Sequence, residues 1–150
     1  MELNSTNETD MGSHRKFMIV FRIVCYICAA YFLAMGFALM LFPAFITRIT
    51  GPQDPIILGM LRGSGGSIIP YSILYLIVAM APFSRRWAII VIALANIVAI
   101  ILDFLSVFLG EYLISYAMFD VPIELLSLLM MVLALVKFSY YNQGVVIEND

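Results

Sequence analysis

Charged side chains are scarce in this sequence, because Asp, Glu, Lys and Arg make up only 12% of its 150 residues. A soluble domain carries about 25% charged and about 45–50% apolar residues, whereas 63% of this chain is hydrophobic. So large an apolar excess cannot be buried inside one small globule, and lipid must cover part of it. The composition therefore predicts one compact integral membrane domain.

Basic residues form no run, and the formal net charge is −2, so nucleic acid is not expected as a partner. The single histidine, His14, lies in a polar N-terminal segment, so an imidazole metal site and serine-type catalysis both lack their parts. A metal site made only of carboxylates is disfavoured, because Arg62 would oppose it. We expect neither a metal nor a cofactor.

Cysteine is almost absent: Cys25 and Cys28 are the only two, and both fall inside the first apolar stretch. In redox proteins such a Cys-x-x-Cys pair sits at an exposed helix N-terminus, where the helix dipole activates a thiol. Here the pair lies about two to three turns inside an apolar helix, which favours two small packing residues. A membrane thiol oxidoreductase built as a four-helix bundle is the alternative.

Four apolar stretches predict an all-α fold, a four-helix antiparallel transmembrane bundle. We expect helices at 17–42, 55–81 and 87–109, and a fourth that ends near 138. About 20 apolar residues span a bilayer, and the first stretch is much too long for the core of a cleaved signal peptide. The expected organisation is a disordered cytoplasmic tail at 1–16, the membrane domain at 17–138, and a second cytoplasmic tail at 139–150.

Proline and glycine mark the expected breaks. The segment 51–55 separates the first two helices, with Asp54 as the N-cap and Pro55 at the first helical position. Pro70 predicts a kink in the second helix. The fourth helix begins either at Asp120, which makes 111–119 an aromatic connection, or near 112, which places Pro122 inside the membrane. We favour the first, since proline is tolerated best in a first turn.

The distribution of Lys and Arg predicts the orientation, because cytoplasmic loops carry an excess of both. Arg48 falls on one side of the predicted bundle, and five basic residues fall on the other: Arg15, Lys16, Arg85, Arg86 and Lys137. Both termini should therefore be cytoplasmic, in a plasma membrane. The glycosylation sequons at 4–6 and 7–9 would then lie on the wrong side and are interpreted as chance matches.

Arg62, Asp103 and Glu124 are charged residues that lie well inside the predicted spans. Each costs roughly 2.5–3.5 kcal/mol to insert, so it needs a partner or a purpose. At 1.5 Å per helical residue all three come to similar heights in the outer half of the bilayer. The sequence thus predicts a buried cluster, which either locks the bundle through an ion pair or lines a cavity for a small polar headgroup, a quinone-like ring or a proton.

Other polar side chains converge on the same region. Asn96 and Asp103 are seven residues apart and share one face of the third helix. Tyr71 lies nine residues past Arg62, deeper in the expected cavity. The candidate ligand-binding residues are therefore Arg62, Asp103, Glu124, Asn96 and Tyr71.

Gly63, Gly65 and Gly66 follow directly after Arg62. Small residues at such spacing usually allow close packing of membrane helices. The alternative is a ligand that lies against bare backbone.

The pattern resembles the small four-helix membrane proteins grouped as DoxX-like. The features that carry the likeness are Pro43, Arg62 with Gly65-Gly66, Asn96 with Asp103, and Glu124, over about 17–138. The resemblance mainly implies the fold, since most members have no known chemistry. Distant four-helix relatives include sterol isomerases and lipid-binding proteins with acidic central pockets, which is compatible with Asp103 and Glu124.

The leading hypothesis for function is the binding of a lipid-like or small amphipathic molecule at the intramembrane polar cluster. Arg62 would hold an anionic or carbonyl group, and Asp103 and Glu124 would orient the ligand or exchange a proton. The alternatives are a structural subunit of a membrane complex, a membrane isomerase with paired carboxylates, and a transporter or proton pathway. Expected partners are membrane lipid and a small amphipathic ligand, with a homo-oligomer as an open alternative.

Overall fold

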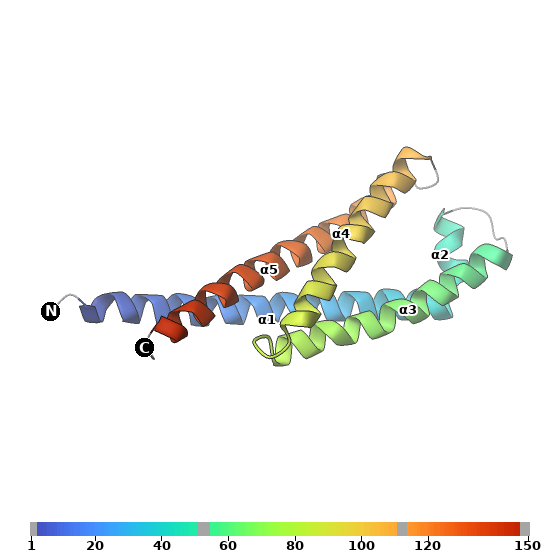
Figure 1. Ribbon diagram of the computed structural model, residues 1–150. Helices are drawn as coiled ribbons and strands as arrows, with labels where there is room; N and C mark the ends of the chain where they lie inside the picture. The colour runs from blue at the N-terminus through green and yellow to red at the C-terminus, as the bar shows by residue number, and fades with distance from the viewer. Residues whose placement is uncertain (1–2, 51–54, 111–113, 148–150) are drawn as a thin grey trace.

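The computed structural model describes residues 3–50, 55–110 and 114–147. The described residues form α1 (Leu3–Leu41), α2 (Pro43–Thr50), α3 (Pro55–Met80), α4 (Arg86–Phe108) and α5 (Ile114–Ile147) (Figure 1). Four segments are long and apolar enough to cross a membrane: Arg15–Leu41, Pro55–Met80, Arg86–Phe108 and Asp120–Ser139. The chain is therefore a multi-pass integral membrane protein with an all-α, four-helix fold.

The two central spans lie where the sequence predicts them, since α3 and α4 match the expected ranges to within one residue at each end. Pro70 lies inside α3, which continues through it. Gly110 follows the last turn of α4 with a φ of +73°, a backbone conformation in which glycine avoids the steric strain of a Cβ atom. The predicted N-cap Asp54 lies outside the described residues.

The helices extend beyond the expected membrane domain at both ends. The predicted disordered tail at 1–16 is wrong from Leu3 onward, because α1 begins there. Similarly, α5 continues through most of the predicted C-terminal tail, as far as Ile147. The physical reason is that helix propagation is easier than nucleation, and no proline precedes Pro43 or follows Pro122 to stop either helix.

The favoured start of the fourth transmembrane helix is also wrong. The helix α5 begins at Ile114, six residues before Asp120, so Pro122 lies inside it and Asp120 is not a cap. Proline removes one main-chain donor, but in membrane helices neighbouring groups and local adjustments satisfy the freed carbonyl. The more costly arrangement, an irregular segment at membrane depth, is thereby avoided.

The four long helices associate as two pairs. The helix α1 packs most extensively on α3, and α4 packs on α5, whereas contacts between the two pairs are far fewer. Figure 1 shows the pairs diverging as a V toward the end that holds α2 and the C-terminal end of α4. The bundle is therefore closed at the end where α3 turns into α4, and it splays at the opposite end, which carries α2.

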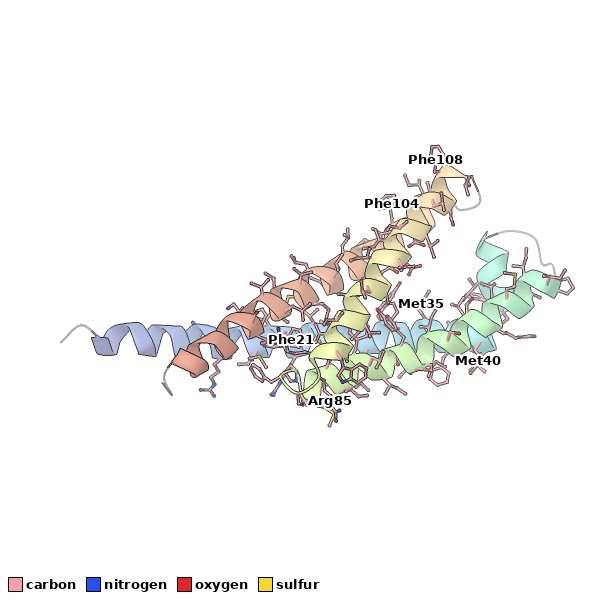
Figure 2. The ribbon with its side chains drawn as sticks, in the orientation of Figure 1. Phe21, Met35, Met40, Arg85, Phe104 and Phe108 are labelled. Atoms are coloured by element: carbon pink, nitrogen blue, oxygen red, sulfur yellow. The ribbon has the colours of Figure 1, made fainter. Side chains whose placement is uncertain are left out.

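The apolar core occupies the closed end. Phe21 of α1 and Phe138 of α5 are almost fully buried there, and their rings meet edge to face at 6.2 Å between centroids. Figure 2 shows Phe21 close to this end, near the turn that carries Arg85. Cys25 and Cys28 are fully buried in the same core as free thiols. The interpretation of these cysteines as packing residues is thus confirmed.

A glycine contact joins α1 to α3. A Cβ atom on Gly65 would lie 2.6 Å from the carbonyl oxygen of Gly36 and 2.8 Å from the main-chain nitrogen of Met40. The predicted packing role is therefore confirmed for Gly65. It is wrong for Gly63 and Gly66, where a Cβ would meet nothing within 4 Å.

Candidate functional site

A cavity of about 390 Å³ lies where the two helix pairs begin to diverge. All four long helices contribute to its wall, and most of the lining is apolar. The polar lining residues are Tyr31, Ser67, Tyr71, Asn96, Asp120 and Glu124, and the apolar ones include Phe32, Met35, Leu39, Ile68, Ala95 and Ala99. Figure 2 shows Met35 on the side of α1 that faces α4. The volume of the cavity lies within the range of about 300–1,000 Å³ that is usual for small-molecule sites.

Glu124 is the most informative lining residue. It lies about one turn from the Asp120 end of the span Asp120–Ser139, yet only 7% of its surface is exposed. Its Oε2 atom is buried and has no hydrogen-bond partner among the described residues. A buried carboxylate oxygen without a partner carries a substantial desolvation cost. A hydrogen-bond donor that reached this carboxylate from the cavity would offset that cost.

Asp120 lies one turn before Glu124 on α5 and lines the same cavity. Its Oδ1 accepts a hydrogen bond from the hydroxyl of Tyr31 on α1. This bond joins the two helix pairs at the cavity wall. The structure thus gives Asp120 a tertiary partner across the bundle, in place of the helix-capping role that the sequence suggests.

Asn96 anchors a buried polar network directly below the cavity. Its amide nitrogen lies 2.9 Å from both the main-chain oxygen of Ile92 and the hydroxyl of Ser127, and 3.1 Å from the hydroxyl of Tyr75. The hydroxyls of Tyr75 and Ser127 are bonded to each other at 2.6 Å. This network joins α3, α4 and α5. Because its polar groups are hydrogen-bonded to one another, we interpret it as a structural floor for the cavity.

Tyr71 forms part of an aromatic cluster beside this floor. Its hydroxyl donates to the main-chain oxygen of Ile92 at 3.2 Å, and its ring meets those of Phe32 and Tyr75 edge to face. Tyr71 and Phe32 both line the cavity. Their position between the polar floor and the apolar walls gives the cavity an amphipathic interior.

Of the predicted site residues, the structure brings Glu124, Asn96 and Tyr71 to one cavity. Asp103 is half-buried near this site and is not among the lining residues; its Oδ2 has no hydrogen-bond partner in the described part of the chain. Arg62 is exposed on α3, does not line the cavity, and forms no ion pair with a described residue. The predicted placement of Arg62 beside the acids is therefore not observed.

The physical reason lies in the divergence of the helix pairs. The rise per residue predicts the height of Arg62, but its direction around α3 depends on how that helix packs. Because α3 packs mainly on α1, the pair α4 and α5 is separated from it at the end that carries α2. An arginine on the exposed face can extend along the helix toward the interface, which lowers its insertion cost.

Among the lining residues that sequence reasoning missed are Tyr31 and Asp120. Tyr31 lies in an apolar run with no polar neighbour at helical spacing, and Asp120 before Pro122 has the appearance of a helix cap. A signal was nevertheless available for Asp120, because it lies four residues before Glu124 and hence on the same face of a continuous helix. Only the incorrect helix start concealed that relation.

The fold and this cavity define a class: a four-span helical membrane protein with a carboxylate-lined pocket between its two helix pairs. Comparisons of the chain with models of protein families, with curated proteins and with solved structures find no match.

Proposed function

We propose that the protein binds a small amphipathic or lipid-like molecule in the cavity between its two helix pairs. The observation that carries this proposal is the buried, unpartnered carboxylate oxygen of Glu124 at the wall of a mainly apolar cavity. Ligand sites usually combine apolar walls with a few polar groups that fix orientation. Ionisable residues within membrane spans also mark functional sites by default. We also propose that the chain is related to DoxX-like proteins, a relation that is compatible with ligand binding.

The shape of the bundle supports entry from the outer half of the bilayer. The pairs diverge toward that end, and the cavity includes residues of all four long helices. At the opposite end the buried core closes the path. A lipid-like molecule could therefore reach Glu124 from the membrane itself, without passing through the closed end of the bundle.

The proposal predicts that protein extracted in a mild detergent retains a defined small molecule, which native mass spectrometry would detect and identify. Replacing Ala99 with Phe should remove that molecule, because Ala99 lines the cavity and the added ring would occupy it. The matched control is Val98→Phe, because Val98 lies next to Ala99 on α4 and is 55% exposed toward the surface. Equal retention by both variants, or an empty parent protein, would count against binding in this cavity.

We also propose that both termini are cytoplasmic and that the protein resides in the plasma membrane. The exposed side chains of Arg85 and Ser84 lie at the α3–α4 turn, at the opposite end from α2. Cytoplasmic loops carry the excess of Lys and Arg. The turn should therefore face the cytoplasm, and α2 should face outward.

Labelling of intact cells with a membrane-impermeant maleimide tests this orientation. The variant Phe45→Cys, at a position 65% exposed on α2, should react, whereas Ser84→Cys should react only after permeabilisation. The parent protein is the control and should give no signal, because Cys25 and Cys28 are fully buried. Reaction of Ser84→Cys alone in intact cells would reverse the orientation.

A further inference from the structure

We infer that the ligand carries a protonated amine, which Glu124 and Asp120 bind while its apolar body lies between the two helix pairs. This inference rests on the proposed function and specifies the chemical class of the ligand. It reverses the expectation from the sequence, in which Arg62 would hold an anionic or carbonyl group.

The charged groups that line the cavity are all acidic. Two carboxylates, Asp120 and Glu124, line it, and none of its described lining residues is Lys or Arg. The third acid, Asp103, lies close enough to Glu124 for the two charges to interact. An anionic head would be repelled by this group of acids, whereas a cation would compensate it.

The carboxylate of Glu124 has hydrogen-bonding capacity that no described residue uses. Glu124 Oε2 is buried without a partner among the described residues, and in the ionised form that a bound cation would favour, a carboxylate oxygen only accepts hydrogen bonds. The nearby donors are already engaged, since Tyr31 donates to Asp120 and Tyr71 to the main-chain oxygen of Ile92. The complementary ligand group is therefore a donor, and an ammonium adds charge to the hydrogen bond.

The remaining wall of the cavity is apolar. Met35 and Leu39 of α1, Ile68 of α3 and Ala99 of α4 give the cavity an apolar surface beside the two carboxylates. A molecule with one cationic head and a hydrocarbon body satisfies both parts at once. A compact polar cation would leave the apolar wall without a partner.

The test uses three probes with the same alkyl chain: dodecylamine, dodecanol and dodecanoate. The full-length protein is reconstituted in nanodiscs of phosphatidylcholine, a net-neutral lipid that does not itself attract cations, and bound probe is measured by native mass spectrometry. We expect dodecylamine to bind most tightly. Glu124→Gln keeps the shape of the side chain and should weaken dodecylamine at least about tenfold, the value of one charge-assisted hydrogen bond, with dodecanol affected much less.

Two control variants separate this inference from the function on which it rests. Arg62→Gln removes an exposed charge away from the cavity and should leave dodecylamine binding unchanged. Ala99→Phe should remove every probe that occupies the cavity. If dodecanol or dodecanoate binds best and Ala99→Phe abolishes it, the cation inference is overturned and the proposed function stands. If no probe is sensitive to Ala99→Phe, both are overturned.

If Glu124→Gln does not fold, a second variant provides the same test. Asp120→Asn changes the second carboxylate of the cavity and should also weaken dodecylamine selectively. Circular dichroism in the same nanodiscs establishes whether each variant is folded before binding is measured. Folded variants of both residues that bind dodecylamine as the parent does would overturn the assignment of the head group to these carboxylates.

Discussion

Gly65→Ala is expected to destabilise the protein by up to about 3 kcal/mol, the upper part of the range for overpacking a close-packed interior. The added methyl group would lie 2.6 Å from the carbonyl oxygen of Gly36 and 2.8 Å from the main-chain nitrogen of Met40. Both are backbone atoms of α1, so they cannot move aside as a flexible side chain could. Equilibrium unfolding in mixed micelles with increasing SDS, followed by circular dichroism, would measure the change in the free energy of unfolding.

Gly66→Ala is the matched control, since it adds the same methyl group one residue further along α3 where nothing lies within 4 Å. It should be neutral or stabilising by up to about 1 kcal/mol, because alanine favours the helix. Gly36→Ala should be intermediate: its shortest contact, 2.8 Å, is to the side-chain Cγ1 of Ile69, which can shift. Equal effects of Gly65→Ala and Gly66→Ala would contradict the close contact of α1 and α3.

Glu124→Met is expected to stabilise the ligand-free protein by about 1–3 kcal/mol while abolishing ligand binding. The methionine side chain is similar in length and removes a buried carboxylate oxygen that has no partner among the described residues. A gain in stability with a loss of function is typical of substitutions at a functional site. The same unfolding assay measures it, on protein that native mass spectrometry shows to be empty, because a bound ligand would itself stabilise the parent.

Asp120→Leu provides the contrast on the same helix. Asp120 accepts a hydrogen bond from Tyr31, so its removal costs this bond between α1 and α5 and should give no comparable gain. A destabilisation of about 1 kcal/mol or less is expected, as for other hydrogen bonds between membrane helices. If Glu124→Met were the more destabilising of the two, Glu124 would have a structural partner, and the argument for a ligand would fail.

The polar cluster illustrates how far reasoning from sequence reaches at this site. Asn96, Tyr71 and Glu124 were predicted to converge, and they do line one cavity. Helical spacing is sufficient for such a prediction when residues lie on the inner face of their helices. For Arg62 and Asp120 it was not sufficient, because the first depends on the direction in which α3 faces and the second on where α5 begins.

The sequence by itself determined that the chain crosses a membrane four times as helices. This followed because apolar length and the scarcity of charge are properties of single segments, and lipid leaves few alternatives to a helix. The ends of α3 and α4, and the burial of Cys25 and Cys28, followed from the same local signals.

Only the tertiary structure decided that the helices pair as α1 with α3 and α4 with α5, and that the pairs diverge at the end that carries α2. That choice depends on contacts such as the one between Gly36 and Gly65, which no spacing within one helix reveals. It placed Arg62 on the exposed surface and opened the cavity beside Asp120 and Glu124. The charge of the site, and hence the class of ligand that we infer for it, arises from packing between helices that are distant in sequence.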